Sequence, residues 1–144
     1  MRRWIVMIDD DVDMHFIYQK VFENLGIAAN LRLFDNGGDA LEFLEHAARE
    51  TRLIFSDINM PVMDGLQLRS AINQWTNADV RSIPFIFLST SARERELKSA
   101  YELFAQGVFQ KGETLQELED CIRIVMSYWG KCRLPETSFS SHHA

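Results

Sequence analysis

Cysteine is scarce in this sequence, which limits the chemistry that the chain can use. Only two of the 144 residues are cysteine, Cys121 and Cys132. Their spacing matches neither a zinc-binding pair nor a C-x-x-C redox pair, so no cysteine-based metal or redox motif is present. We expect both residues to be reduced thiols in the cytoplasm, with one of them buried on a helix.

Long hydrophobic runs are absent from the start of the chain. The N-terminus, MRRWIVMIDDD, has two arginines but only five apolar residues before the acidic ones. This run is too short for the hydrophobic region of a signal peptide or for a membrane span. We therefore expect no export, a cytoplasmic location and no membrane partner.

Clusters of basic residues are missing as well. The formal net charge is −6, and the 15 lysine and arginine residues are scattered along the chain. Nucleic-acid phosphates are bound by clustered Lys and Arg side chains, so direct contact with DNA or RNA is not expected.

The composition is that of one ordinary folded domain. Hydrophobic residues make up 47% of the chain and charged residues 25%, so a buried core needs no disulfide or structural metal. A length of 144 residues leaves little room for a second folded unit. We place the domain at residues 1–130. The end of the chain is rich in Ser and Thr and has no periodicity, which predicts a flexible tail over residues 131–144.

Short apolar runs alternate with helical patterns along the chain. The runs are WIVMI, NLRLF, LIFS, PFIFL and the weaker GVFQ. Strands buried on both faces of a parallel sheet have this continuous apolar character, and alternation with helices is typical of βαβ units. The sequence therefore predicts an α/β fold, a doubly wound five-stranded parallel sheet with (βα)5 order.

The helical patterns repeat apolar residues at i, i+3 and i+4. The first runs from Met14 to Leu25, with Gly26 as its C-terminal stop. The other four are anchored by Leu41, Leu44 and Ala48, by Leu68, Ile72 and Trp75, by Leu97, Ala100, Tyr101 and Phe104, and by Leu115 to Trp129. Thr114 is the expected N-cap of the last helix.

Polar side chains follow four of the predicted strands. Asp9 and Asp10 follow the first strand and Asp57 the third, while Ser89 and Lys111 follow the fourth and fifth. Ligands of open parallel sheets bind beyond the carboxyl ends of the strands. A lone Asp there is usually a cap or a turn residue, but five such positions at one edge favour a functional site.

Carboxylates crowded in this way predict a bound cation. Two carboxylates about 4 Å apart repel each other by roughly 4 kcal/mol at an effective dielectric constant near 20. Mg²⁺ takes one or two protein carboxylates, which Asp10 and Asp57 can supply, and keeps waters that a phosphoryl oxygen can displace. Asp57 could then attack a phosphorus atom, with Lys111 and the Ser89 hydroxyl holding the oxygens of the transferred group. Asp11 lies nearest the first helix and is expected to cap it.

Four motifs, IDDD, SDINMPVMDG, PFIFLSTSA and FQK, occur in this order and resemble the receiver domain of bacterial two-component response regulators of the stand-alone, chemotaxis-regulator type. The match covers the chain from about Trp4 to Trp129. It implies a flavodoxin-like fold with strand order 2-1-3-4-5. It also implies a signalling protein rather than an enzyme, with self-phosphorylation and self-dephosphorylation as its only chemistry.

The resemblance implies roles for the matching acidic residues. Asp57 looks like the phosphoacceptor, which takes a phosphoryl group from a phosphohistidine on a histidine kinase or phosphotransfer protein. Asp9 and Asp10 look like the acidic pair that positions Mg²⁺. Asn59 matches the position whose backbone carbonyl completes the metal shell.

Further matches lie around these acids. Ser89 looks like the switch hydroxyl that moves to the phosphoryl group, and Lys111 like the lysine that pairs with it. Pro61, Asp64 and Gly65 match the loop after the acceptor, where a fixed turn and a helix N-cap explain them.

Three positions depart from the family pattern. Thr90 stands where Ala or Gly is usual, and its bulk predicts slower phosphoryl entry or loss. Gly112 replaces the proline that normally follows the lysine in a cis peptide, so the Lys111–Gly112 bond is either cis or rerouted as trans. The usual aromatic switch position is Val108, with Phe109 on the opposite face of the strand.

The resemblance implies that the output is a contact with another protein. The face expected to bind a downstream target comprises the helix around Leu97–Phe104, the strand 107–110 and the last helix, and a homodimer stays open.

Two other functions also stay open. A phosphorylation-independent interaction module would need an Asp57 that cannot be modified, and a phosphatase of the haloacid dehalogenase type would normally have an acid at Asn59. A flavin binder is disfavoured because Asp9 to Asp11 would repel its phosphate.

Overall fold

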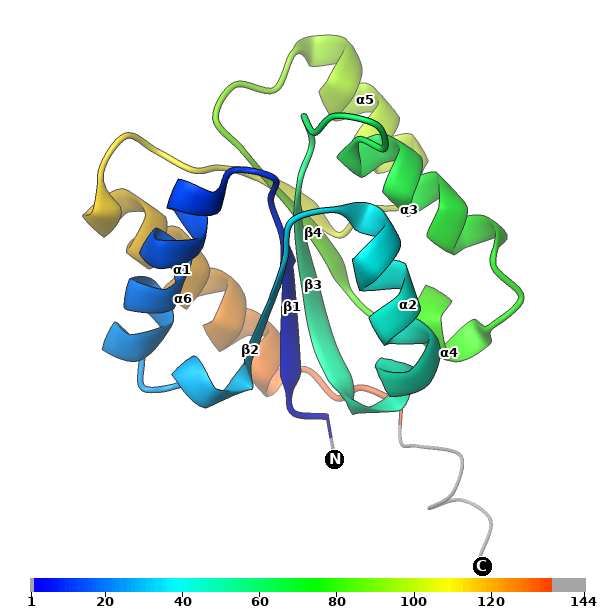
Figure 1. Ribbon diagram of the computed structural model, residues 1–144, viewed down its shortest axis with the longest axis horizontal. Helices are drawn as coiled ribbons and strands as arrows, with labels where there is room; N and C mark the ends of the chain where they lie inside the picture. Colours follow the sequence, from blue (N-terminus) through cyan, green and yellow to red (C-terminus); the bar gives the residue numbers. More distant parts are fainter. Residues whose placement is uncertain (1, 136–144) are drawn as a thin grey trace, which may run out of the picture.

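Five parallel strands form the central sheet of the computed structural model, which describes residues 2–135 (Figure 1). The strand order is β2-β1-β3-β4-β5, as predicted. The strands are β1 (Trp4–Ile8), β2 (Leu31–Phe34), β3 (Thr51–Asp57), β4 (Phe85–Ser89) and β5 (Gly107–Gln110). Each predicted apolar run became a strand, because its alternate side chains are buried on opposite faces of the sheet.

Helices connect the strands and cover both faces of the sheet (Figure 1). The helices are α1 (Val12–Asn24), α2 (Gly37–Ala47), α3 (Gly65–Gln74), α4 (Ala78–Arg81), α5 (Glu94–Glu102) and α6 (Leu115–Lys131). Two single 3₁₀ turns, η1 (Ala28–Asn30) and η2 (Ala48–Glu50), precede β2 and β3. The predicted flexible tail, residues 131–144, falls mostly outside the described residues.

Two hydrophobic clusters fill the space on either side of the sheet. One lies between the sheet and α1 and α6, and is built around Phe22, Phe55 and Ile122. The other lies between the sheet and the helices α2 to α5, and is built around Leu44 and Phe87 among others. Figure 1 shows the same division, with α1 and α6 on one side and the remaining helices on the other. This is the doubly wound arrangement that the alternating sequence predicts.

Local capping sets where the helices next to the strand ends begin. The Asp11 carboxylate accepts a hydrogen bond from the Asp13 amide at 3.0 Å, which confirms it as the N-cap of α1. Asp64 and Gln67 form a capping box at α3, and Thr114 caps α6. Gly26 has φ +76° and ends α1 as predicted, because glycine adopts this conformation without steric cost.

The predicted extents of two helices were wrong. Trp75 has extended backbone beyond the end of α3, and Phe104 lies beyond α5 with φ +67° and a side chain that is 73% exposed. Both apolar residues continue a helical spacing, but the chain turns before it reaches them. The short helix α4 was not predicted, because four residues with one buried side chain, Val80, leave no periodic pattern.

None of the helices in residues 2–135 combines the length and the apolar character required to cross a membrane.

Candidate functional site: an acidic cluster beside a buried lysine

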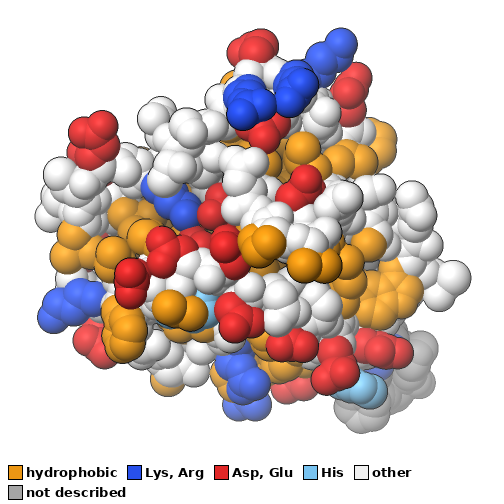
Figure 2. All heavy atoms as spheres, turned by 45° about the horizontal axis from the view of Figure 1, so that its top comes forward, with side chains coloured by type: hydrophobic (Ala, Val, Ile, Leu, Met, Phe, Trp, Pro, Cys, Tyr) orange, Lys and Arg blue, Asp and Glu red, His pale blue; other side chains and the backbone are white. Residues whose placement is uncertain are grey.

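Three carboxylates meet at the carboxyl edge of the sheet. Asp9 and Asp10 directly follow β1, and Asp57 is the last residue of the adjacent strand β3. One oxygen from each of the three lies within 4.8 Å of the others. Figure 2 turns this edge toward the viewer and shows acidic side chains gathered near the middle of the face, with hydrophobic side chains around them. The parallel register of β1 and β3 is what brings residues 48 positions apart in the chain to one place.

Lys111 reaches this cluster from the end of β5, the edge strand that lies two strands from β3. Its ammonium nitrogen lies 2.8 Å from Asp9 Oδ2 and 3.4 Å from Asp57 Oδ2, and the side chain is buried. The backbone amide of Lys111 donates to the Ser89 carbonyl, which extends the β4–β5 ladder by one residue and fixes the starting point of the side chain. One cation against three carboxylates leaves the cluster with a formal charge of −2, which a divalent cation would neutralise.

Burial shapes the acidity of Asp57. It raises the pKa of the Asp57 carboxyl above its ordinary value, and the nearby Asp9 charge acts in the same direction. The Lys111 ammonium and the Ile58 amide oppose this by stabilising the ionised form. Burial removes part of the hydration of the ionised Asp57 carboxylate, and its protein partners replace only part of that hydration. The carboxylate therefore attracts a further positive charge.

Asp9 is held more firmly than the other two acids. Its Oδ2 accepts hydrogen bonds from the Tyr18 hydroxyl at 2.7 Å and from Lys111, and its Oδ1 accepts one from the Asp11 amide at 3.0 Å. A ring nitrogen of His15 lies 2.7 Å from the Asp9 carbonyl oxygen. Asp9 and Tyr18 are each only 1% exposed.

Sequence reasoning missed Tyr18. Tyr18 lies within the apolar stripe from Met14 to Leu25 that predicts the first helix, and this position alone gives it no role in the site. The available signal was its hydroxyl, because a phenol on a buried stripe usually needs a hydrogen-bond partner. Burial, and then the Asp9 charge and hydrogen bond, raise the pKa of Tyr18 far above its ordinary value, so the hydroxyl stays protonated.

Ser89 is the last residue of β4 and is 1% exposed. Its hydroxyl oxygen has no hydrogen-bond partner within residues 2–135. The residue before it, Leu88, pairs with Asp57 in the sheet, so Ser89 stands one step beyond the level of Asp57 on the neighbouring strand. A buried hydroxyl without a partner costs free energy, and a ligand oxygen at this edge could satisfy it.

The loop after Asp57 turns sharply away from the sheet. The Gly65 amide donates to the Ile58 carbonyl at 2.7 Å, so the start of α3 lies against the end of β3. Between them Asn59 is exposed, and Val62 protrudes into solvent with φ +67°. Gly65 is required at this point because a Cβ atom there would collide with the Asp57 carbonyl and with Phe87.

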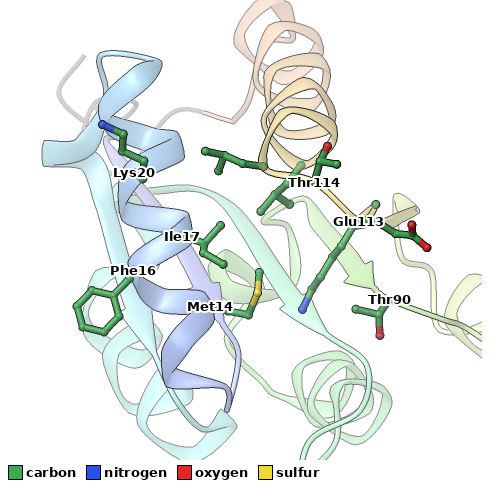
Figure 3. Close-up of a pocket in the computed structure, with 11 residues that line it drawn as sticks. Met14, Phe16, Ile17, Lys20, Thr90, Glu113 and Thr114 are labelled. Carbon is green, nitrogen blue, oxygen red and sulfur yellow. The ribbon is translucent and has the colours of Figure 1, made fainter.

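An apolar cavity of about 330 Å³ opens beside the cluster, between α1 and the loop that leads into α6. Figure 3 shows Met14 and Ile17 of α1 on one side, with Thr90 and Glu113 on the other. Lys111 also lines it, so the cavity and the acidic cluster share that side chain. Thr90, which is exposed and directly follows Ser89, also lines the cavity.

Two of the departures from the family pattern have a structural outcome. The described residues contain no cis peptide bond, so the Lys111–Gly112 bond is trans, and Gly112 has φ +80°. Val108 and Phe109 face the two different hydrophobic clusters, as predicted. The Val108 amide donates to the Tyr101 hydroxyl at 3.3 Å, which places an aromatic side chain of α5 over β5.

The comparisons with known proteins agree with one another. The profile of the response regulator receiver domain matches residues 5–123. The response regulator Rcp1 of Synechocystis is 27% identical over 130 residues, and the alignment covers 87% of each chain. The chemotaxis protein CheY1 of Helicobacter pylori is 26% identical over 122 residues, covering 85% of this chain and 95% of the relative.

Solved structures are similar over nearly the whole chain. The Mn²⁺-bound form of Rcp1 has a TM-score of 0.74 at 26% identity and covers 92% of this chain and 99% of that one. The phosphorylated cyanobacterial phytochrome response regulator RcpA has a TM-score of 0.80 and covers 94% of this chain and 100% of that one. At 22% identity, the second comparison shows the shared fold alone.

Proposed function

The chain belongs to the response regulator receiver family, and from that premise we propose that it accepts a phosphoryl group on Asp57 and signals through contact with another protein. The donor in this proposal is a phosphohistidine on a histidine kinase or a phosphotransfer protein. Receiver domains in general act with such kinases and with downstream targets, and the relatives named above are signalling proteins rather than metabolic enzymes.

One observation supports this proposal most directly. Lys111 lies between Asp9 and Asp57, within 2.8 Å of one carboxylate and 3.4 Å of the other. The longer distance leaves its ammonium able to follow a new anionic oxygen on Asp57 while it keeps its bond to Asp9. A phosphoryl group on Asp57 would bring three such oxygens to this edge.

The donor set fits a hard divalent cation. Asp9, Asp10 and Asp57 each have a carboxylate oxygen within 4.8 Å of the others, and hydrogen bonds engage Asp9 most. Asn59 follows closely enough in the chain to offer its backbone carbonyl. A cation bound there would supply positive charge to the phosphoryl oxygens as the group is transferred. The Mn²⁺-bound form of Rcp1 supports a divalent cation in a relative, and we propose Mg²⁺ for this chain.

Each residue then has a chemical task. An Asp57 oxygen attacks phosphorus, the new O–P bond forms, and the N–P bond of the donor breaks with its electron pair returning to the donor imidazole. Lys111 balances the charge that accumulates on the phosphoryl oxygens. The Ser89 hydroxyl, which has no partner within residues 2–135, donates to one of these oxygens.

We propose that the modified protein is read through the face formed by α5, β5 and α6. Tyr101 of α5, Phe104 just beyond α5, and Ile124 and Tyr128 of α6 are exposed apolar side chains along this face. Aromatic side chains, which make up three of these four, are enriched at protein interfaces. Movement of Ser89 toward a phosphoryl group would pull on β4, which pairs with β5 along this face.

The two other functions have less support. A phosphatase of the haloacid dehalogenase type needs a second acid where this chain has the exposed amide Asn59. A phosphorylation-independent module would have no use for a buried lysine shared by two carboxylates.

The test is to incubate the protein with Mg²⁺ and acetyl phosphate and to measure its intact mass. We expect one phosphoryl group on the parent, none on Asp57→Ala and none without a divalent cation. Labelling that persists in Asp57→Ala, or a parent that stays unlabelled, would contradict the proposal. Steady release of phosphate from an unrelated ester would instead favour the phosphatase.

A further inference from the structure

The three acids of the cluster are not equally able to bind an ion. A carboxylate has about four positions at which it accepts hydrogen bonds or a metal. Asp9 uses three of them within the protein, for Tyr18, Lys111 and the Asp11 amide. Asp10 is exposed, and its carboxylate has no hydrogen bond or ion pair within residues 2–135. Asp57 accepts a longer hydrogen bond from Lys111, at 3.4 Å, so Asp9, with one acceptor position left, is the most engaged of the three carboxylates.

Tyr18 is the part of this arrangement that the proposed phosphoryl transfer does not need. Lys111 would pair with Asp9 without it, and the Asp11 amide would still bond to Oδ1. The Tyr18 ring is packed in the hydrophobic cluster between α1 and the sheet, so its hydroxyl reaches Asp9 Oδ2 from a fixed direction. Together with Lys111 it occupies both acceptor positions of that oxygen, which limits rotation of the carboxylate toward Asp10 and Asp57.

The number of carboxylates matters for which ion binds. Mg²⁺ prefers octahedral coordination with one or two carboxylates and retains several waters. Ca²⁺ takes six to eight oxygen ligands in flexible geometry, so a further carboxylate favours it. An oxygen of Asp9 lies within 4.8 Å of oxygens of Asp10 and Asp57, near enough to join an ion if the carboxylate could turn.

We propose that Tyr18 is a positioning residue that determines ion specificity: its hydroxyl holds Asp9 away from the bound cation and so keeps the site a two-carboxylate site selective for Mg²⁺ over Ca²⁺. This inference rests on the cation site of the proposed function. It goes beyond that function by assigning the choice of ion to a residue outside the acidic cluster.

The experiment measures ion preference rather than phosphorylation. The full chain is loaded with Mn²⁺, whose free concentration is followed by electron paramagnetic resonance, and Mg²⁺ or Ca²⁺ is added as competitor. The parent is compared with Tyr18→Phe, which keeps the ring and removes the hydroxyl. Tyr128→Phe is the matched control, because Tyr128 is exposed and its hydroxyl has no hydrogen-bond partner within residues 2–135.

We expect the ratio of Ca²⁺ affinity to Mg²⁺ affinity to rise about tenfold in Tyr18→Phe, the lower end of what loss of an outer-shell partner does to metal sites. Tyr128→Phe should keep the parent ratio. In the double variant Tyr18→Phe, Asp9→Asn the ratio should return toward the parent value, because a neutral amide is a poorer ligand than the released carboxylate.

Each other outcome overturns a defined claim. A parent that binds Mn²⁺ together with an unchanged ratio in Tyr18→Phe overturns the role of Tyr18 alone. Equal losses of affinity for both ions in Tyr18→Phe overturn it too, because they indicate general loosening of the site. A correctly folded parent that binds no divalent cation overturns both this inference and the cation site of the proposed function.

Discussion

The main chain of Gly65 packs directly against the carbonyl oxygen of Asp57, with no room between them for a side chain. The contact is reinforced by the hydrogen bond from the Gly65 amide to the Ile58 carbonyl. It anchors the start of α3 against the end of β3, and so fixes both ends of the loop that carries Asn59.

Gly65→Ala should destabilise the protein by about 3 kcal/mol, the upper part of the usual range for overpacking. The added methyl group meets backbone atoms of Asp57 and Ile58, which cannot move without bending β3. Urea unfolding measures the loss. Gly130→Ala is the control, because Gly130 lies in α6 with nothing within 4 Å of its Cβ position, and it should gain about 0.5 kcal/mol. Equal stability of the two variants would contradict the contact.

Gly112→Ala should destabilise the protein more than Gly26→Ala. Both glycines have positive φ, of +80° and +76°, which costs an L-residue about 1–2 kcal/mol. Only at Gly112 would the Cβ also meet a neighbour, Glu117 Cβ at 2.6 Å, while Gly26 has open space. Because Gly112 follows Lys111, its variant should also be phosphorylated more slowly by acetyl phosphate. The idea fails if both variants lose the same stability and the same rate.

Asp57→Asn should stabilise the metal-free protein at neutral pH and not in acid. The pKa of Asp57 is raised above 3.8 in the folded state, mainly by burial, so the folded state prefers the protonated acid. The parent therefore loses stability as the pH rises from about 3.8 through the raised folded pKa, and the neutral amide does not. Thermal unfolding in a chelator at pH 3.5 and pH 7 compares the two proteins.

The Asp57→Asn advantage at pH 7 should shrink when Mg²⁺ is added, because an ion that binds only the folded parent restores its stability. An advantage of the same size at both pH values, or a variant less stable than the parent at pH 7, would show that burial is not the dominant influence on Asp57.

Thr90→Ala should speed phosphoryl entry or loss at Asp57. The Thr90 side chain lines the same cavity as Lys111 and directly follows Ser89, so we expect its bulk to narrow the approach to the cluster (Figure 3). Mass measurements over time after addition and removal of acetyl phosphate give both rates. Thr76→Ala, an exposed threonine in the loop between α3 and α4, should leave the rates unchanged. Unchanged rates in Thr90→Ala would refute the steric explanation.

Much of the fold could be predicted because its signals are local. The run WIVMI became β1 with the same bounds, and the stripe from Met14 to Leu25 became α1, since burial on two faces or on one stripe leaves a pattern in the sequence. Where the pattern continued but the chain turned, as at Trp75 and Phe104, the prediction failed. Capping hydrogen bonds and the left-handed turn at Phe104 ended those helices. The spacing of apolar residues does not predict a capping hydrogen bond or a left-handed turn.

The acidic site shows the same division. The sequence by itself determined that Asp9, Asp10, Asp57 and Lys111 lie at or just after the carboxyl ends of strands, and parallel strands deliver such residues to one edge. Only the tertiary structure decided that Tyr18 donates to Asp9, that Lys111 lies nearer Asp9 than Asp57, and that Gly112 turns with positive φ. These contacts depend on how α1 and α6 pack against the sheet and on where β5 ends. The spacing of residues along the chain does not specify distances across the sheet.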